Sequence, residues 1–502
     1  MKLFRPQRSP RLRAGILLLA AALSAAGCGR LLGPEPDEVP TLRLTTARIR
    51  GFDPAHAADE ASIRATGRIY EGLLQYAYWD RPYRVEPLLA AGMPEVSADG
   101  LVWRFTLRPG IFFADDRCFA ATGGKGRELV AADVVYSLKR IADLKVASGG
   151  YWVFRGKIAG LDEFREASRG DDPTDYDREV AGLRALGPHE LEIRLTEPYP
   201  QLPWVLAMPY AFVVPREAVE YYGGGFVNHP VGTGPYVLAR AWQNYRYEYR
   251  TNPKWPETGR TDAMPAGAPA PEAGQPLPRT PRIVDSVVGD PSTAWLMFLS
   301  GRLDQVNVGR EQWDSIITPD KELRPELAAR GIRLDKAPQL SVSYIAFNMD
   351  DPVVGANRKL RQALSFAFDS AAWQEFQNGR VAQPTGPVPP GVVGYREEPL
   401  PYAFDPGRAR RLLAEAGYPD GKDPATGRRL KLTLEIGAAD NPEARQSAEL
   451  VASFMDRIGV VLEPSYNNWP AFLKKIEQRQ AQMFSVTWIG DYPDAQNFLQ
   501  LF

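Results

Sequence analysis

The sequence predicts a mixed α/β protein with more than one domain. A chain of 502 residues is too long to fold around a single hydrophobic core. Apolar and polar residues alternate over 101–107, which is typical of a strand, whereas 132–144 places its apolar residues on one helix face. A strand over 430–436, a helix over 442–458 and a strand over 460–463 follow one another. This βαβ order implies a parallel pair of strands, so we expect an α/β fold with long irregular loops rather than an all-β fold.

The N-terminus has the order of an export signal. Residues 1–27 carry five cations and no acid, followed by the short apolar run 14–23 and by small residues. The run is shorter than a membrane-spanning helix requires. The segment Leu23–Cys28 resembles a bacterial lipobox, so we expect a signal peptide over 1–27 and a lipid on Cys28. A plain secretory signal followed by an incidental cysteine is the alternative. Residues 28–40, with three prolines, are expected to form a tether.

The composition excludes several classes of protein. With 44% hydrophobic and 24% charged residues, the chain is neither a disordered protein nor a polytopic membrane protein. Removing the five cations of the export signal from the 60 Lys and Arg leaves 55 against 61 Asp and Glu. A mildly acidic body argues against broad binding of nucleic acid, which depends on phosphate contacts.

Further elements can be assigned in order along the chain. Strands are expected at 191–195 and 484–488, and a hairpin from 232–238 and 245–249. Helices are expected over 292–300, between Asp405–Pro406 and Gly417, and between Asn441–Pro442 and Gly459, because the last two have an N-cap residue, a proline at the first position and a C-terminal glycine. The segment 251–282 is dense in Pro, Gly and Ala, so we expect a long surface excursion there.

Local catalytic motifs are nearly absent. The three histidines are far apart in sequence, and His189 leads into a strand pattern rather than a zinc-binding helix. No serine lies in a Gly-x-Ser-x-Gly setting, and Gly124–Lys125 lacks the leading glycine of a P-loop. Cys118 is expected to be a half-buried thiol near a turn rather than a nucleophile, and Asp115–Asp116 exposed loop carboxylates rather than an acid pair or metal site. We expect no metal and no cofactor, although carboxylates brought together by the fold could still form a catalytic site.

A series of short segments points to one family. They are Gly51–Pro54, Ile69–Leu74, Glu86–Ala90, Leu107–Phe113, Ala132–Arg140, Gly232–Tyr236, Ser300–Asp304, Phe347–Asn348, Lys359–Ser365, Gly386–Pro390, Ala409–Pro419 and Trp488–Asp494. In this order they resemble the extracellular solute-binding proteins of peptide-type ABC transporters, along nearly the whole mature chain. Each segment alone is a weak signal, but so many in the order of the family make a strong one.

The resemblance implies a two-lobe, type II periplasmic-binding-protein architecture with an extra domain inserted in the first lobe. On this basis the first lobe comprises 41–70 and 185–290, with 71–184 as the inserted domain and 291–502 as the second lobe. Members of the family continue past the residue that matches Phe502, so the C-terminal part of the fold is expected to be missing.

The resemblance also implies a function without catalysis: capture of short peptides in a cleft between the lobes and delivery to the permease subunits of an ABC importer. The residue matching Asp491 pairs with the α-amino group of the peptide, which a carboxylate recognises through a charge-assisted hydrogen bond. The expected ligand-binding residues are Trp488, Ile489, Gly490 and Asp491 in one cleft segment and His56, Asp59 and Glu60 in the opposing loop. The peptide main chain would be held much as an added strand.

The resemblance leaves two alternatives open. One is a receptor of the same fold for a non-peptide solute such as a metal chelate, haem or a sugar; the less favoured one is a surface-anchored enzyme that uses carboxylates. In either case we expect a monomer in the cell envelope that does not bind nucleic acid. Its lipid anchor at Cys28 would hold it to the periplasmic or extracellular face of a membrane.

Overall fold

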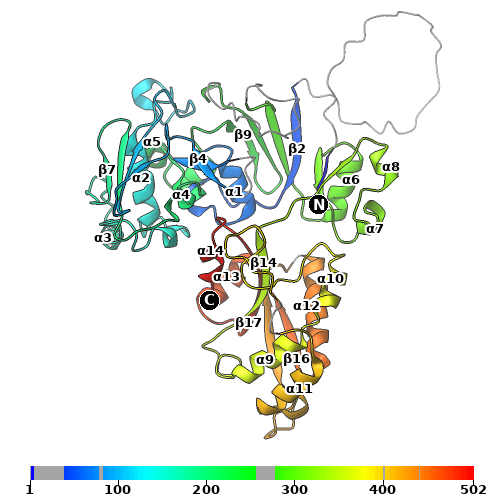
Figure 1. Ribbon diagram of the computed structural model, residues 1–502. Helices are drawn as coiled ribbons and strands as arrows, with labels where there is room; N and C mark the ends of the chain where they lie inside the picture. The colour runs from blue at the N-terminus through cyan, green and yellow to red at the C-terminus, as the bar shows by residue number, and fades with distance from the viewer. Residues whose placement is uncertain (1, 5–38, 78–82, 256–276, 399–401, 440) are drawn as a thin grey trace, which may run out of the picture. The chain divides into compact units, whose positions relative to one another are not determined.

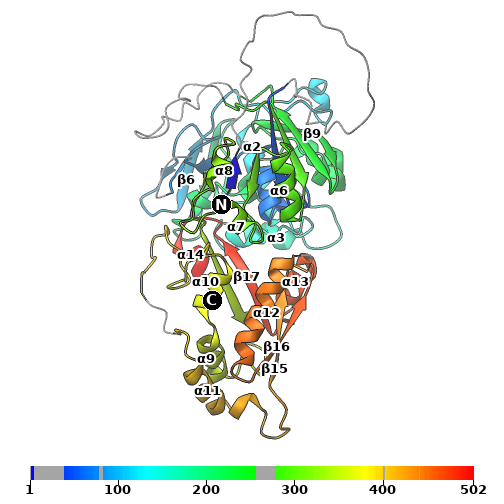
Figure 2. The same cartoon turned by 90° about the vertical axis from the view of Figure 1, so that its right-hand side faces the viewer.

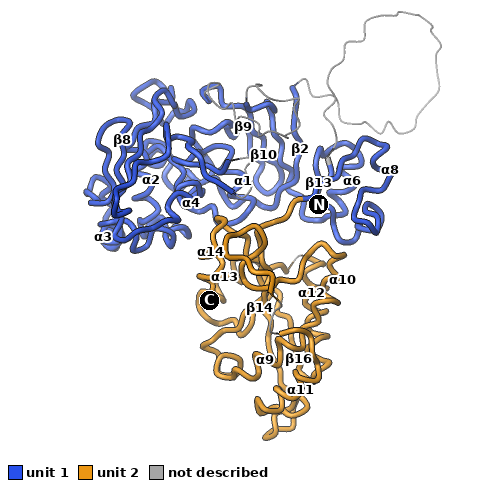
Figure 3. Tube along the Cα trace, in the orientation of Figure 1, with its two compact units in different colours: residues 1–336 blue, residues 337–502 orange. Residues whose placement is uncertain are grey.

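The structure is a computed structural model that describes residues 2–4, 39–77, 83–255, 277–398, 402–439 and 441–502 (Figure 1). Cys28, the signal peptide apart from residues 2–4, and nearly all of the tether lie outside the described residues, as does 256–276 of the predicted excursion. The chain divides into two compact units, Met1–Lys336 and Ala337–Phe502 (Figure 3). They are called unit 1 and unit 2 below, and each is described by itself.

The central sheet of unit 1 pairs a strand from early in the chain with a strand from much later in the chain. Its strand order is β2-β11-β10-β9, with β11 parallel to β2 and the other neighbours antiparallel. The strands are β2 (Thr41–Thr46), β9 (Tyr236–Trp242), β10 (Arg246–Thr251) and β11 (Arg282–Val287). The predicted hairpin is therefore confirmed as β9 and β10. On β10, Tyr247 and Tyr249 are fully buried and meet the ring of Phe52 edge-on.

A second sheet in unit 1 is antiparallel, in the order β5-β6-β8-β7. Its strands are β5 (Glu95–Val96), β6 (Val102–Thr106), β7 (Leu183–Ala185) and β8 (Glu190–Arg194). The strands predicted at 101–107 and 191–195 are thus confirmed, and the helix predicted at 132–144 is α2 (Ala131–Ala142). The same unit contains β3 (Leu74–Tyr76), β4 (Val85–Pro87), α1 (Glu60–Thr66), α3 (Leu161–Ala167), α4 (Leu202–Val205) and α5 (Arg216–Tyr222).

Residues 291–336 belong to unit 1, and the predicted second lobe over 291–502, which is a different kind of division, stays a prediction. Their elements are α6 (Pro291–Leu299), β12 (Gln305–Asn307), α7 (Trp313–Ile316), α8 (Pro325–Ala328) and β13 (Arg333–Asp335). The physical reason is their packing: the backbone N–H of Arg43, on β2, donates to Asp304 at 2.7 Å. The described part of the predicted signal peptide, β1 (Lys2–Phe4), pairs with both β12 and β13, and Leu3 is fully buried in their apolar cluster.

Unit 2 contains one four-stranded mixed sheet in the order β14-β17-β15-β16. The strands are β14 (Ser341–Phe347), β15 (Lys431–Ile436), β16 (Val461–Tyr466) and β17 (Met483–Ile489). Because β15 and β16 are parallel and α12 (Pro442–Asp456) connects them, the predicted βαβ unit is confirmed. Figure 2 shows α12 lying along this sheet. The other helices are α9 (Arg358–Ala367), α10 (Ser370–Phe376), α11 (Pro406–Glu415), α13 (Trp469–Glu477) and α14 (Ala495–Leu499).

The ends of α11 and α12 are formed as the sequence predicts. Asp405 accepts a hydrogen bond from the backbone of Arg408, and Asn441 from that of Ala444. The glycines that follow, Gly417 and Gly459, have φ values of +95° and +90°, where a side chain would be strained. In the parts of the chain that the structure describes, no helix has both the length and the apolar character needed to cross a membrane.

Candidate functional site

The segment that follows β17 is held tightly as it leaves the sheet. The backbone N–H of Gly490 donates to the carbonyl of Leu340 at 2.8 Å, which continues the pairing of β17 with β14. A Cβ atom at Gly490 would lie 2.7 Å from Cζ of the fully buried Phe498 on α14. This position therefore requires glycine, because the short helix packs directly beneath the segment.

Asn497 of α14 ties this segment together from below. Its side chain is fully buried, and its Oδ1 accepts from the indole N–H of Trp488 at 3.1 Å and from the backbone N–H of Asp491 at 3.0 Å. Its Nδ2 donates to Oδ2 of Asp491 at 3.1 Å. One amide therefore holds two of the residues that the sequence predicts to bind ligand.

The carboxyl group of Asp491 lies in an environment that disfavours its charge. Burial raises its pKa above the ordinary value, and the hydrogen bond from Asn497 acts in the opposite direction. A carboxylate in this state gains more from a cationic ligand group than an exposed one does, because the cation offsets the cost of desolvation. Beside it, the side chain of Ile489 is 44% exposed, whereas Trp488 packs against the apolar cluster of Val342 and Phe498.

The predicted loop residues of unit 1 are engaged in contacts within that unit. Nδ1 of His56 lies 3.3 Å from Oδ2 of the buried Asp53, and Nε2 lies 2.7 Å from the carbonyl of Val146. Asp59 caps α1 by accepting from the backbone and hydroxyl of Ser62 at 3.0 and 2.9 Å. Glu60, the first residue of α1, is exposed. The structure thus places these three residues close together at the start of α1 and just before it in unit 1, and the other four in one segment of unit 2.

Sequence reasoning missed Asn497, which stands among the apolar residues of 496–502. No local hydrophobic pattern distinguishes this asparagine, because the residues that it bonds to, Trp488 and Asp491, lie before the turn that leads into α14. The available signal was its position: a side chain with both a donor and an acceptor follows the Trp488–Asp494 motif within one helical turn.

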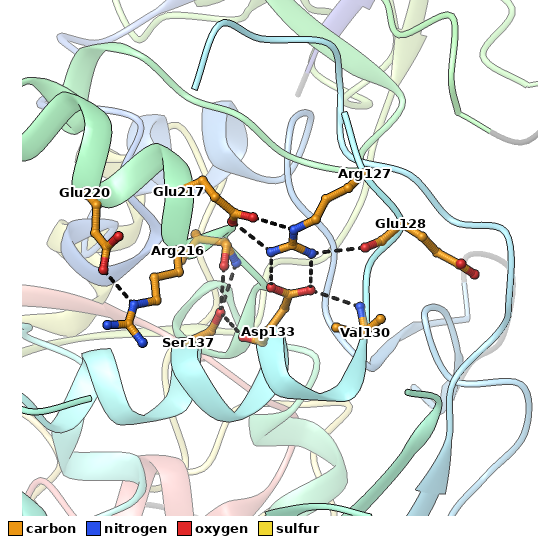
Figure 4. A network of polar contacts seen from close by, with 9 residues as sticks. Arg127, Glu128, Val130, Asp133, Ser137, Arg216, Glu217 and Glu220 are labelled. Atoms are coloured by element: carbon orange, nitrogen blue, oxygen red, sulfur yellow. Dashed lines mark hydrogen bonds and ion pairs between the residues drawn. The ribbon is translucent and has the colours of Figure 1, made fainter. Parts of the chain in front are cut away.

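A network of charged side chains in unit 1 is centred on Arg127 (Figure 4). All five N–H groups of Arg127 donate: to Asp133 at 2.7 and 2.8 Å, to Glu217 at 2.5 and 2.8 Å, and to the carbonyl of Glu128 at 3.0 Å. These bonds join α2 to α5. An arginine with every donor occupied holds structure together and has no N–H left for a substrate.

The other reactive residues named by the sequence are also engaged. Cys118 is buried, and burial together with its hydrogen bond to Asp116 raises its pKa to about 12, the opposite of an activated nucleophile. Asp115 pairs with Lys254 at 2.5 Å, and Asp116 accepts from the hydroxyl of Tyr222 at 2.9 Å. Among the described residues, no three His, Cys, Asp or Glu side chains are grouped so that they could hold a metal ion.

Comparison with known families decides which class of protein carries this segment. The family model described as bacterial extracellular solute-binding proteins, family 5 Middle, matches residues 84–502. The chain belongs to this family. Its members are solute-binding proteins that act outside the cytoplasm, so the family predicted from the sequence motifs is confirmed.

Individual relatives agree with the family match. The di/tripeptide-binding protein 2 of Pseudomonas aeruginosa is 27% identical, over 97% of this chain and 82% of its own length. The heme-binding protein A of Haemophilus influenzae is also 27% identical, over 97% of this chain and 83% of its own length. The dipeptide-binding protein of Escherichia coli is 25% identical, over 80% and 68% respectively.

Solved structures establish the fold. The Helicobacter pylori periplasmic binding protein DppA, in complex with the peptide STSA, matches with a TM-score of 0.69 at 22% identity, over 91% of this chain and 80% of that chain. The murein tripeptide binding protein MppA of Escherichia coli matches with a TM-score of 0.70 at 22% identity, over 92% and 82% respectively. These matches confirm the predicted α/β, two-lobe periplasmic-binding fold, whereas the inserted domain over 71–184 stays a prediction.

Proposed function

We propose that this chain is a peptide receptor of an ABC importer, which binds short peptides through their free α-amino group and delivers them to the permease. The observation that carries the proposal is the geometry at Asp491. A carboxyl group whose pKa is raised by burial is held at the end of β17, beside the partly exposed Ile489. Trp488, Ile489 and Gly490 would form the rest of this subsite. In unit 1, His56, Asp59 and Glu60 stay predicted ligand-binding residues, and of these Glu60 has an exposed side chain.

The peptide assignment draws support from the relatives. Two of those described above are named for dipeptides or tripeptides. A receptor that binds the α-amino group and the main chain of a peptide accepts peptides of many sequences, because these two groups are the same whatever the side chains are. The saturated Arg127 network and the raised pKa of Cys118 favour a receptor over an enzyme.

Haem is the second candidate ligand, because the heme-binding relative is as similar to this chain as the di/tripeptide-binding one. Haem carries no ammonium group, so a haem receptor would gain nothing from a desolvated carboxylate at Asp491. The two candidates therefore make opposite predictions for this residue.

The experiment is isothermal titration calorimetry on protein purified from cells that express the whole chain. We expect trialanine to bind and N-acetyl-trialanine to bind about 30-fold to several-thousand-fold more weakly, because removing one charge of a desolvated pair costs about 2–5 kcal/mol. Asp491→Asn should weaken trialanine by a similar factor and leave the acetylated peptide unchanged, because both changes remove the same pair.

Asp456→Asn, which changes an exposed carboxylate of α12 in the same unit, serves as the control and should leave both affinities unchanged. Equal affinity of the wild type for the two peptides would remove Asp491 from its role. Tight binding of haem that Asp491→Asn does not alter would establish the second candidate instead.

The lipid anchor at Cys28 is a further part of the proposal and lies outside the described residues. Cys28→Ser should release the protein from the membrane fraction or leave the precursor unprocessed, because lipidation requires the thiol. Immunoblots of fractionated cells measure this. A variant that fractionates with membranes as the wild type does, at the processed size, would contradict the anchor.

A further inference from the structure

We propose that Asn497 is a positioning residue for ligand recognition: its buried amide fixes the orientation of the Asp491 carboxylate that meets the ammonium group of the ligand. This inference rests on the proposed function, because it assigns a second residue to the same subsite. It starts from three hydrogen bonds that converge on one side chain.

The position of Asn497 demands a side chain of particular chemistry. Oδ1 of Asn497 accepts from Trp488 and from the backbone of Asp491, while Nδ2 donates to the Asp491 carboxylate. Only a side chain with both an acceptor and a donor, at the reach of asparagine, satisfies all three bonds. Leucine has the size but neither function, and aspartate has the acceptors but lacks the donor.

The amide of Asn497 is shielded from water. Asn497 and its neighbour Phe498 are fully buried, and Phe498 in turn contacts the position of Gly490. Water cannot replace a bond that is lost at Asn497, so the groups it holds would be left unsatisfied or would move. The amide therefore restrains both the backbone and the carboxylate of Asp491, which reduces the conformational freedom that ligand binding must otherwise remove.

The amide of Asn497 also affects the charge of Asp491. The N–H group of Asn497 donates to the ionised form of Asp491 and so opposes the effect of burial on its pKa. Binding of an ammonium group requires the ionised form. The affinity of the wild type for a free-amino peptide should therefore fall as the pH is lowered through the pKa of Asp491. We call this fall in affinity at low pH the acid limb, and Asn497 sets the pH at which it occurs.

The test measures trialanine affinity between about pH 4 and pH 7, where the amino group of the peptide stays protonated, with N-acetyl-trialanine measured in parallel. In Asn497→Ala the acid limb should move to higher pH, and trialanine should bind about 10- to 100-fold more weakly at neutral pH. The affinity for the acetylated peptide should not change. A defect of folding alone would weaken both ligands equally.

A second variant covers the case in which Asn497→Ala does not fold. Asn497→Asp keeps the acceptor oxygen that serves Trp488 and the backbone of Asp491 but replaces the donor by a second carboxylate oxygen facing Asp491, and a like charge raises the pKa of its neighbour. Its acid limb should move to higher pH, and its melting temperature relative to the wild type should recover as the pH is lowered, because protonation of one carboxyl group removes the repulsion. Asn467→Ala is the matched control, because Asn467 donates to the carboxylate of Glu435 at 2.6 Å in the same unit; its acid limb should not move.

The outcomes separate the two proposals. If the wild type does not distinguish trialanine from its acetylated form, the role of Asp491 and the proposed function are wrong. If the wild type distinguishes them but neither variant of Asn497 moves the acid limb, the proposed function stands and the role of Asn497 is wrong. The role of Asn497 is also wrong if its variants weaken the binding of both peptides by the same factor.

Discussion

At the scale of single residues, the buried carboxylate of Asp53 links two parts of unit 1. Arg140, on α2, donates to its two oxygens at 2.7 and 2.6 Å, and His56 approaches at 3.3 Å. Burial works against ionisation, but the hydrogen bonds from His56 and Arg140 outweigh it and lower the pKa of Asp53. In return, the hydrogen bond with Asp53 raises the pKa of His56 above 6.5, although burial opposes this.

This pairing predicts a pH dependence of stability. Because the pKa of His56 is higher in the folded than in the unfolded state, its stabilising contribution is complete below pH 6.5 and is lost as the pH rises through the folded value. In His56→Gln the melting temperature should fall less between about pH 6 and pH 8 than it does in the wild type. Scanning calorimetry at a series of pH values measures this.

His229→Gln is the control for this series, since the ring of His229 bonds to the carbonyl of Gly225 rather than to a carboxylate. It should retain the slope of the wild type. An unchanged slope in His56→Gln would show that the contact with Asp53 does not contribute to stability in this pH range.

At the scale of elements, the sequence predicts best those whose signals are local. The ends of α11 and α12 follow from a capping side chain, a proline and a glycine, and β15 from strict alternation over 430–436. The three-residue strands β12 and β13 have no such pattern, because three residues are too few to show one. The end of unit 1 at Lys336 is not marked locally either, because 291–336 is assigned to that unit by what it packs against and not by its own composition. The predicted division into lobes stays a prediction.

The residues of the candidate site also differ in whether a local sequence signal predicts them. A motif is enough to name Asp491 and its neighbours, since the motif is contiguous. Asn497 lies only six residues further on, but its role depends on α14 folding back beneath the segment, and its position after the motif does not by itself encode that fold. For Asp59, the resemblance to the family names the residue as a ligand-binding candidate but does not reveal that its side chain caps α1.

The excursion between β10 and β11 allows a test at this scale. Its ends already meet, because Arg250 pairs with Arg282 and the N–H of Thr251 donates to the carbonyl of Pro281 at 3.1 Å. Replacing 256–276 by a short Gly-Ser linker should change the free energy of unfolding by no more than about 1 kcal/mol, since each halving of a loop is worth about 0.6 kcal/mol. Urea titration measures the difference.

Trp255 must be kept in that deletion, because its indole N–H donates to the buried Glu71 at 3.1 Å. A deletion extended through Trp255 serves as the comparison and should be clearly more destabilising. If the shorter deletion costs as much as the longer one, the excursion is not a surface addition.

At the scale of the whole molecule, unit 2 is formed from one continuous stretch of chain. All four strands of its sheet and the core around Phe454 come from residues after Lys336. We therefore expect Ala337–Phe502 expressed alone to fold, with mixed α/β circular dichroism and a cooperative thermal transition. Phe454→Ala should lower its stability by about 3–5 kcal/mol, because the ring is fully buried. Non-cooperative melting of the isolated stretch would contradict its independence.

Unit 1 is assembled differently, through the parallel pairing of β2 with β11. Thr41 lies opposite Arg282, so the first strand of the sheet obtains its partner only after most of the unit has been synthesised. Closing such a large loop is slow compared with forming local helices and hairpins. We therefore expect the sheet of unit 1 to close late in folding, when the residues of β11 become available to β2.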